Sequence, residues 1–395
     1  MRSFLNILLA LPAVLGAATV DKRQTADTVS GSWIARVQDN SPLSTVLNTL
    51  RLTTNIVPKH QYNFGTFRGF AFDGDESLVD LVASIPLIAS IEPDTTVRAS
   101  APVVEKRALV QQTPAEYGLV RISRRARGGN TYTYDNTAGA GSFIYVIDTG
   151  VNAGHQEFGG RAVNGANFVA TEPLIATDLN GHGTHCSGTA AGATYGVSKR
   201  ANVIAVKVLG ALGTGLNSGV LAGIDWAVNN ARQNGRTGRS VFSLSLGGGF
   251  SQQTNDAVKA ATDAGIFVAV AAGNDGADAR QTSPASEPSV FTVGATDAND
   301  NRASFSNFGP VVDGFAPGVD IKSAWIGSRT ATNTISGTSM ACPHVAGLAA
   351  YLIGLEGPRS PAALAARIKS LATTGVIVNA GAGSPNTLVY NGSGQ

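Results

Sequence analysis

The sequence predicts an α/β fold, with a mainly parallel sheet flanked by helices, and a small α+β domain that precedes it. From residue 108 onward, short apolar runs typical of strands alternate with helix-compatible segments, which is the pattern of a parallel sheet covered on both faces. Residues 31–100 instead carry strand and helix patterns within about 70 residues, at the small end of what folds alone.

The small domain is predicted from five segments. Residues 32–37 alternate at period two, as a half-buried strand does, and residues 44–52 place apolar side chains on one helical face. Residues 60–72 are rich in aromatic side chains with glycines between them, which indicates paired strands. A short helix is expected at 76–83 and a strand at 88–91.

The large domain, residues 108–395, is predicted from four continuous apolar runs and two helices between them. In such sheets the functional residues gather at the carboxyl ends of the strands, so residues that follow a strand are the candidates for a site. The expected strands are 143–147, 203–209, 241–246 and 266–270, and the expected helices are 219–233 and 254–264.

The N-terminus predicts export. Arg2 supplies positive charge, residues 4–15 are almost wholly apolar, and small residues end the segment at Ala18. An apolar core of about 12 residues is too short to span a bilayer, which needs about 20, so residues 1–18 are predicted to be a signal peptide. No later stretch reaches 18 uncharged apolar residues, so we expect a secreted, extracellular protein with no membrane partner.

The charge and the cysteine content of the sequence limit its binding partners and its disulfide bonds. The formal net charge of +2 gives no electrostatic footprint for nucleic acid. The two cysteines, Cys186 and Cys342, are too few for a disulfide framework, and the sequence leaves open whether they pair.

Residues 101–107 look like a linker between the two domains. The pair Lys106 and Arg107 in this linker is therefore predicted to be a processing point rather than merely a solvated charge pair.

Asp148 ends a predicted strand and enters the turn formed by Thr149 and Gly150. A carboxylate there is well placed to orient a histidine, although an Asp that caps a turn has the same local pattern. Asp-Thr-Gly is also the signature of aspartic proteases. The sequence has no second copy and no Asp-Ser-Gly, so a two-carboxylate mechanism lacks its partner.

His182 lies in a helix-like segment, residues 180–192, that is built almost entirely from small residues. Small side chains let this helix pack tightly while it presents His182 in its first turn. His185 follows on the same helical face, but the further ligands of a helical zinc site are missing. Metal binding is therefore the weaker interpretation, and His185 is expected to be structural.

Ser339 is expected at the start of a helix, with Pro343 in the opening turn, where a missing N–H has no intrahelical partner to lose. A nucleophile there faces free backbone donors and the positive end of the helix dipole, whereas the ordinary alternative is a capping serine. Ala341 breaks the Gly-x-Ser-x-Gly pattern of esterases and lipases.

Asn274 follows a buried strand and Gly273, where it either forms a turn or directs its amide at an oxyanion.

These motifs, in this order, resemble the active-site blocks of the subtilisin superfamily, and most closely the secreted proteinase K-like enzymes of fungi. The resemblance implies a serine endopeptidase that hydrolyses proteins and peptides through an acyl-enzyme. It implies that Ser339 is the nucleophile, that His182 is the general base, and that Asp148 orients His182. Asn274 and the backbone N–H of Ser339 would form the oxyanion hole.

The resemblance covers nearly all of residues 108–395, while residues 31–100 resemble the inhibitory propeptide of such enzymes. Residues 19–107 are therefore expected to be a propeptide, and the precursor a zymogen. The propeptide would act as an intramolecular inhibitor of a monomeric enzyme until the chain is cleaved near Arg107.

A substrate cleft is implied as well. Two segments would pair with an extended substrate backbone, and small or apolar walls would form a primary pocket for apolar or aromatic side chains. The preference should be broad, since apolar contacts discriminate by only about 1–3 kcal/mol per methylene. The pairing segments are Gly213, Thr214, Gly215 and Leu216 on one side and Ser245, Leu246 and Gly247 on the other, and the pocket walls are Leu246, Ala271, Ala272 and Gly273.

The resemblance further implies a structural calcium ion, bound by the carbonyls of Pro288 and Val290 and by the carboxylate of Asp313, and no organic cofactor. One departure concerns disulfides. Two positions at which proteinase K-like enzymes often carry half-cystines are Phe143 and Phe291 in this sequence.

A sequon that starts at Asn391 predicts a glycan at an exposed position near the C-terminus. Two rival functions are also consistent with parts of the sequence. One is a catalytically inactive fold of the same type that serves as a binding module. The other is an esterase that uses the same three residues, against which the broken elbow pattern counts.

Overall fold

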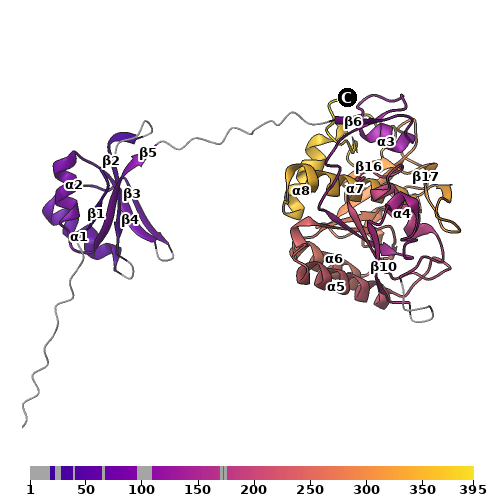
Figure 1. The fold of residues 1–395 in the computed structure, drawn as a ribbon, viewed down its shortest axis with the longest axis horizontal. Helices are drawn as coiled ribbons and strands as arrows, with labels where there is room; N and C mark the ends of the chain where they lie inside the picture. Colours follow the sequence, from indigo (N-terminus) through magenta and orange to yellow (C-terminus); the bar gives the residue numbers. More distant parts are fainter. Residues whose placement is uncertain are drawn as a thin grey trace, which may run out of the picture. The chain divides into compact units, whose positions relative to one another are not determined.

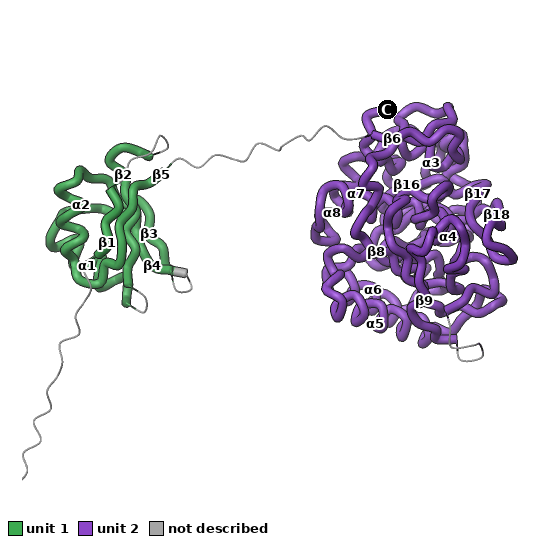
Figure 2. Tube along the Cα trace, in the orientation of Figure 1, with its two compact units in different colours: residues 1–104 green, residues 105–395 purple. Residues whose placement is uncertain are grey.

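The computed structural model describes residues 18–22, 28–38, 41–64, 67–95, 109–169, 172 and 176–395. The chain separates into two compact units, residues 1–104 and residues 105–395 (Figure 1 and Figure 2). Apart from Ala18, the predicted signal peptide lies outside the described residues, and so does the predicted processing pair Lys106–Arg107.

Unit 1 is a five-stranded sheet with two helices whose apolar faces join one core with the strands. The sheet order is β1-β5-β2-β4-β3, and its neighbours are antiparallel except for β1 and β5. The predicted α+β unit is therefore confirmed. Its elements are β1 (Thr19–Val20), β2 (Thr28–Val37), α1 (Leu43–Thr53), β3 (His60–Phe64), β4 (Phe67–Asp73), α2 (Glu76–Ala83) and β5 (Ile88–Thr95).

Unit 2 is built on a nine-stranded sheet in the order β19-β20-β16-β15-β13-β11-β8-β10-β9. All neighbours are parallel except β19 and β20, so the predicted mainly parallel sheet is confirmed. The strands are β8 (Phe143–Asp148), β9 (Ala162–Asn167), β10 (Asn202–Lys207), β11 (Ser240–Leu244), β13 (Phe267–Ala271), β15 (Phe291–Thr296), β16 (Gly314–Pro317), β19 (Thr373–Thr374) and β20 (Thr387–Leu388).

Helices cover both faces of this sheet. The helices α4 (His182–Ala191), α7 (Thr338–Glu356) and α8 (Pro361–Leu371) pack in one apolar cluster with the strands. The helices α5 (Asn217–Gln233) and α6 (Gln252–Asp263) contact each other and belong to a second cluster (Figure 1). Two cores separated by the sheet explain why β11 and β13 are buried along their whole length and β8 everywhere except its first residue, Phe143.

Shorter elements complete unit 2. They are the strand pairs β6 (Leu109–Gln112) with β7 (Tyr132–Asp135), β12 (Gly248–Gly249) with β14 (Thr282–Ser283) and β17 (Ile321–Ala324) with β18 (Thr332–Ile335), the helix α3 (Tyr117–Ile122), and the single turns η1 (Gln156–Phe158), η2 (Thr237–Arg239) and η3 (Ala279–Gln281).

Helix α7 is the centre of the first core. Among the described helices, it is long and apolar enough to cross a membrane by length and composition alone, but most of it is buried inside unit 2. A helix that is apolar on all sides belongs in the interior of a protein or of a membrane, and the surrounding strands identify α7 as a core helix.

Candidate active site

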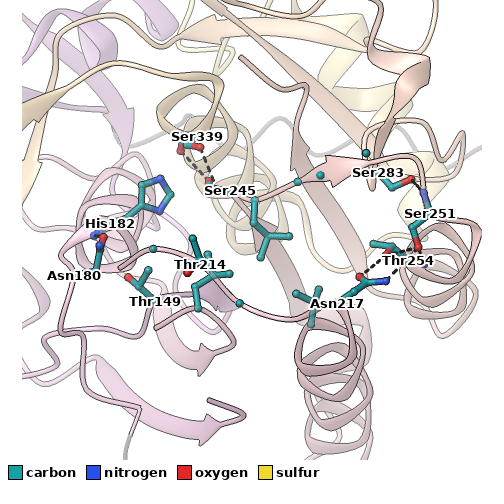
Figure 3. A pocket seen from close by; sticks show the side chains of 18 residues that line it. Thr149, Asn180, His182, Thr214, Asn217, Ser245, Ser251, Thr254, Ser283 and Ser339 are labelled. Atoms are coloured by element: carbon teal, nitrogen blue, oxygen red, sulfur yellow. Dashed lines mark hydrogen bonds between the residues drawn. The ribbon is translucent and has the colours of Figure 1, made fainter. Parts of the chain in front are cut away.

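Four parallel strands, β8, β10, β11 and β13, bring the residues that follow them to one edge of the sheet. Strand β10 ends at Lys207, two residues before the predicted end, because the N–H groups of Val208 and Leu209 both donate to the carbonyl of Asp148. A cleft of about 660 Å³ opens at this edge, and His182 from α4 and Ser339 from α7 both line it (Figure 3). A second pocket of about 480 Å³ shares Ser339 with the cleft and includes Asn274.

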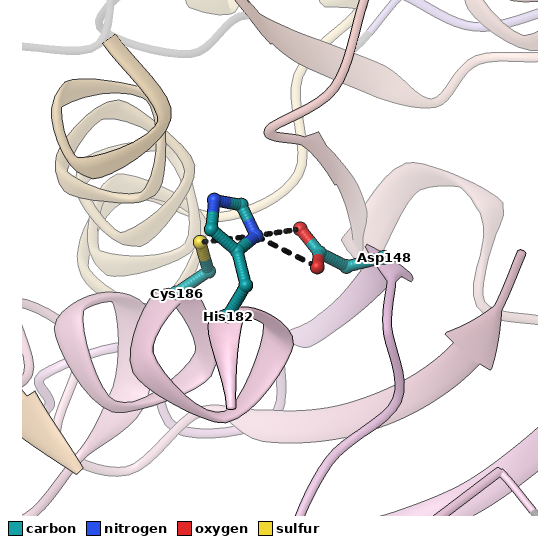
Figure 4. Close-up of side chains that lie close together, drawn as sticks. All are labelled: Asp148, His182 and Cys186. Atoms are coloured by element: carbon teal, nitrogen blue, oxygen red, sulfur yellow. Dashed lines mark hydrogen bonds and ion pairs between the residues drawn. The ribbon is translucent and has the colours of Figure 1, made fainter. Parts of the chain in front are cut away.

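Asp148 and His182 form a hydrogen-bonded pair in the wall of the cleft. The Asp148 carboxylate is fully buried at the end of β8, and the His182 Nδ1 atom lies 2.8 Å from its Oδ1 and 3.0 Å from its Oδ2. The backbone N–H of Thr149 also donates to Oδ1, at 2.7 Å. Since a carboxylate only accepts, Nδ1 carries the proton, and the Nε2 atom, which points away from Asp148, is left as an acceptor (Figure 4).

Two opposing effects set the pKa of His182. Burial is the largest single effect and alone would lower this pKa because it disfavours the charged imidazolium, but the charge and hydrogen bond of Asp148, together with the neighbouring Cys186, outweigh it. The net result is a pKa of His182 well above its usual 6.5. The site therefore stabilises an imidazolium, the state that a general base reaches after it takes a proton.

Helix α4 is held against the end of β8 by a close backbone approach. The N–H of Gly183 donates to the Thr149 hydroxyl at 2.9 Å, and a Cβ atom on Gly183 would lie only 2.2 Å from the carbonyl oxygen of Gly150. Only a glycine fits at this distance. The small residues that the sequence shows in this helix thus bring the histidine within reach of Asp148.

Asp178 fixes the start of the same helix. Its buried carboxylate accepts hydrogen bonds from the N–H of Gly181 at 2.8 Å and from the N–H and hydroxyl of Thr184 at 2.9 and 2.6 Å. It also accepts from the Thr149 hydroxyl at 2.9 Å. Sequence reasoning missed Asp178. An acidic residue just before a helix that lacks a side-chain cap was the available signal.

The first prediction concerns this packing. Gly183→Ala should push α4 away from the turn after β8 and lengthen the hydrogen bond between His182 and Asp148. A displacement of about 1 Å at a reacting group costs on the order of 10²-fold in rate, and we expect a fall of this size in kcat/KM for a peptide substrate.

The matched control is Gly238→Ala, because a Cβ there would meet its nearest neighbour at an ordinary 3.5 Å. Its kcat/KM should equal that of the wild type. A Gly183→Ala enzyme with wild-type kcat/KM would contradict the role given to the close approach.

Ser339 is the second residue of α7, which begins at Thr338. Its hydroxyl lines the cleft and donates to the carbonyl of Ser245 at 3.2 Å. The hydroxyl hydrogen of Ser339 is thus directed at Ser245 rather than at Nε2 of His182. Such hydrogen bonds are often long or misaligned before substrate binds.

The predicted position of Pro343 in the opening turn is wrong. Pro343 is the sixth residue of α7, where an N–H would normally bond to the carbonyl four residues earlier, that of Ser339. The carbonyl that Pro343 leaves free accepts from the Ser245 hydroxyl at 2.8 Å and from the Cys186 thiol at 3.4 Å. One backbone atom of Ser339 thereby joins α7 to α4 and to the segment after β11.

Both cysteines are free and buried, which answers the question that the sequence left open. Burial raises the pKa of the Cys186 thiol and raises that of Cys342 to about 12, so both remain protonated. Among the described residues, Asp148, His182 and Cys186 form a cluster with metal-ligand spacing. A protonated thiol is a poor ligand, however, and Nδ1 of His182 is already bonded to Asp148.

His185 does not take part in this cluster. Its Nε2 atom lies 2.9 Å from the carbonyl oxygen of Ile321, and burial lowers its pKa to about 4, so that the ring stays neutral. The predicted structural role of His185 is therefore confirmed.

Asn274 follows β13 and lines the second pocket. Its Oδ1 accepts from the N–H of Thr338 at 2.8 Å and from the Thr338 hydroxyl at 2.9 Å. The two hydrogen bonds to Oδ1 fix the orientation of the Asn274 amide. Its NH₂ group therefore points away from Thr338 and lies near Gly337, the residue before α7. Thr338, which sequence reasoning did not single out, therefore orients the Asn274 amide.

Most of the predicted substrate-contacting residues line the two pockets, but two do not. Leu216 is 77% exposed as the residue before α5, and Ala272 is fully buried in the second core, so neither belongs to the described pocket walls. The predicted residues that do line a pocket are Gly213, Thr214, Gly215, Ser245, Leu246, Gly247, Ala271 and Gly273. Residues that sequence reasoning missed include Asn180, Ser283, Asp275 and Asp278.

The residues predicted to hold calcium do not fit that ion in this arrangement. One carboxylate oxygen of Asp313 lies 2.6 Å from the Nζ atom of Lys369, and the other accepts from the N–H of Thr292 at 2.9 Å. The charge of the carboxylate is thus already compensated, and a calcium ion would have to displace Lys369 to use it.

The predicted glycan at Asn391 is contradicted. The side chain is fully buried, and its Nδ2 atom, to which a glycan would attach, donates to the carbonyl of Thr133 at 2.8 Å. The Oδ1 atom accepts from the N–H of Ser393 at 3.0 Å. The sequon lies near the C-terminus in sequence but inside the folded unit in space.

This fold and cleft are those of a serine endopeptidase. Comparison with known proteins makes the class specific: the model of the Subtilase family matches residues 139–390, and the chain belongs to this family. It is 47% identical to subtilisin-like protease 2 of Pseudogymnoascus destructans, over 99% of this chain and 96% of the relative.

Other relatives agree in name and in fold. The chain is 42% identical to the cuticle-degrading protease of Metarhizium anisopliae, over 98% of this chain and 99% of the relative. The crystal structure of a cold adapted subtilisin-like serine proteinase superposes with a TM-score of 0.67 at 45% identity, and covers 71% of this chain and 99% of that protein.

Proposed function

We propose that unit 2 is a secreted endopeptidase that cleaves proteins through an acyl-enzyme, with Ser339 as nucleophile, His182 as general base and Asp148 as the residue that orients the base. The observation that carries this proposal is the hydrogen bond between Asp148 and His182 Nδ1, which leaves Nε2 as a proton acceptor in the cleft that Ser339 also lines.

In the first step the Ser339 hydroxyl attacks the scissile carbonyl carbon and gives its proton to Nε2 of His182. The resulting imidazolium is stabilised by the buried Asp148 carboxylate. His182 then gives this proton to the leaving amine as the C–N bond breaks. In the second step His182 takes a proton from a water molecule, whose oxygen attacks the carbonyl carbon of the acyl-enzyme. The bond between this carbon and the Ser339 oxygen then breaks, His182 gives the proton to that oxygen, and the new acid leaves.

Two hydrogen-bond donors are proposed to stabilise the negative charge that develops on the carbonyl oxygen when Ser339 attacks. One is the NH₂ group of Asn274, whose direction is fixed by Thr338, and the other is the backbone N–H of Ser339 near the start of α7, where the helix dipole is positive. Removal of one such donor typically costs about 10²–10³-fold in kcat. Every proton transfer in this scheme uses side chains of the chain itself, so we propose no organic cofactor.

Direct labelling tests the proposed nucleophile and excludes the inactive-fold rival. A serine-directed fluorophosphonate should label purified mature enzyme at Ser339, as mass spectrometry of the labelled peptide would show. Absence of label at Ser339 would instead favour a binding module. Turnover of a protein substrate compared with a simple ester separates the peptidase from an esterase, and the peptidase should cleave both.

The primary pocket is proposed to accept apolar and aromatic side chains before the scissile bond. Leu246, Ala271 and Gly273 supply small or apolar walls. The structure adds two carboxylates to the lining, and that of Asp278 is neutralised by Arg280 at 2.6 Å. Cleavage profiling with a peptide library should therefore show a broad preference for Leu, Phe and Tyr. A profile dominated by Lys and Arg would assign the specificity to Asp275 instead.

The chain is further proposed to be a monomeric zymogen that is exported and then cleaved near Lys106–Arg107. Residues 1–18 would be the signal peptide and residues 19–107 the propeptide, with unit 1 acting as an intramolecular inhibitor. Two separate compact units support a division of this kind, and the cuticle-degrading relative is named for an extracellular substrate. N-terminal sequencing of active enzyme should begin close to Ala108, whereas active enzyme that still carries Gly31 would refute the scheme.

A further inference from the structure

Lys369 and Asp313 meet where the resemblance led us to expect a calcium ion. We propose that the Lys369 ammonium replaces calcium at this position, so that the stability of this part of unit 2 does not depend on calcium. The proposal concerns stability and is independent of the catalytic roles assigned above.

The contact is specific in its geometry. Lys369 lies in the last turn of α8, and its Nζ atom lies 2.6 Å from Oδ1 of Asp313. Backbone hydrogen bonds fix Asp313 beside β15: its Oδ2 accepts from the N–H of Thr292, and its own N–H donates to the carbonyl of Thr292, each at 2.9 Å. The side chains of Asp313 and Lys369 are 21% and 46% exposed, so the carboxylate is well shielded and the ammonium partly so.

A second feature of this chain supports the ammonium from another side. The Nζ atom of Lys369 lies 5.8 Å from the centre of the Phe291 ring, within the range of a cation–π interaction. Phe291 is buried and stands at a position where proteinase K-like enzymes often have a half-cystine. An aromatic ring at the half-cystine position and the ammonium of Lys369 therefore lie beside the same carboxylate.

Charge and coordination favour the tethered ammonium over a free dication. One carboxylate is neutralised one-to-one by Lys369, whereas Ca²⁺ would leave excess positive charge beside the ammonium. Calcium also needs six to eight oxygen ligands, and both oxygens of Asp313 are already engaged. An ammonium carried on α8 has no binding equilibrium with the solvent, so its contribution does not follow the calcium concentration.

Thermal unfolding tests the proposal. Mature enzyme inactivated with a serine-directed sulfonyl fluoride, to prevent self-cleavage, is melted in EDTA and in millimolar calcium. If calcium does not bind at Asp313 in the wild type, this residue contributes nothing to any effect of calcium on Tm. The Tm difference between EDTA and calcium should therefore be the same in Asp313→Asn as in the wild type. This comparison separates the position from any calcium site elsewhere in the chain.

Lys369→Met removes the ammonium and keeps the apolar stem. We expect its Tm in EDTA to fall by roughly 3 °C, as for a modest loss of stability in a domain of this size, and millimolar calcium should restore it by occupying the vacated position. The control is Lys259→Met, which removes an exposed ion pair to Asp263 on α6 and should change Tm little and without response to calcium.

Three results would overturn the proposal. One is a calcium response of the wild type that Asp313→Asn abolishes, because calcium would then displace Lys369. Another is a Lys369→Met enzyme that melts at the wild-type temperature in EDTA. The third is a Lys369→Met enzyme that stays destabilised in calcium, which would identify an ordinary ion pair rather than a replaced metal site.

Discussion

Ser339→Ala should reduce kcat for peptide hydrolysis by about 10⁶-fold, because it removes the atom that we propose forms the acyl-enzyme. The residual rate should stay about 10³–10⁴-fold above that of the reaction in water, since the proposed oxyanion donors, Asn274 and the backbone N–H of residue 339, are unchanged. Steady-state kinetics with a chromogenic peptide measure the first effect. If processing is autocatalytic, the same precursor should accumulate uncut, as gel electrophoresis and N-terminal sequencing would show.

Ser336→Ala is the matched control for this variant. Ser336 lies three residues earlier in the chain, outside the cleft, and its hydroxyl accepts from the backbone N–H of Asp320 at 2.9 Å. The Ser336→Ala enzyme should process itself and hydrolyse peptides at the wild-type rate. A Ser339→Ala enzyme that retains appreciable turnover would show that another group is the nucleophile.

Asp148→Asn should lower kcat by about 10⁴-fold and should also move the pH profile. In the wild type burial lowers the pKa of His182, but the charge and hydrogen bond of Asp148, with Cys186, together hold this pKa well above 6.5. A protonated His182 cannot accept the Ser339 proton, so kcat/KM should rise with pH through this raised pKa and reach its plateau on the alkaline side. Without the carboxylate, burial is the dominant effect and lowers the pKa of His182, opposed only by Cys186, so the ascending limb of the variant should move to lower pH.

The pH dependence of kcat/KM measures this shift separately from the loss of rate. Asp225→Asn is the control, since Asp225 is an exposed residue of α5 whose carboxylate accepts from the amide of Asn229 at 3.2 Å. Its profile should coincide with that of the wild type. An ascending limb that stays in place in Asp148→Asn would show that the limb reports a group other than His182.

Local pattern was enough to predict most of the fold. Helix α2 spans the predicted residues 76–83, and its start is marked by Asp75, whose side chain accepts from the N–H of Leu78. The apolar run that ends at Asp148 became the interior strand β8, because a continuous β-branched and aromatic segment is stable only when both of its faces are covered. Periodicity and turn residues carry this information within the segment itself.

Two of the errors concern contacts between residues far apart in sequence. The amide of Asn391 is bonded to Thr133, and the carboxylate of Asp313 is bonded to Lys369. Thr133 is not part of the sequon at Asn391, and Lys369 is not part of the predicted calcium ligand set. Neither local pattern could therefore indicate that the side chain is already bonded. The orientation of Asn274 by Thr338 is likewise invisible to a local pattern, although both residues lie next to motifs that were recognised.

The carbonyl of Ser339, which Pro343 leaves without a helical hydrogen bond, affects how readily one enzyme molecule can be digested by another. For an enzyme that cuts polypeptides, neighbouring molecules are potential substrates, and a folded chain is cut only after a segment detaches from it. Because α4 and the segment after β11 are bonded to this one carbonyl of α7, none of the three can detach without breaking a bond to another. Ser339, the proposed nucleophile, is thus also a point at which three segments are joined, and we expect loss of activity on storage to follow the opening of all of unit 2 rather than local fraying of the cleft.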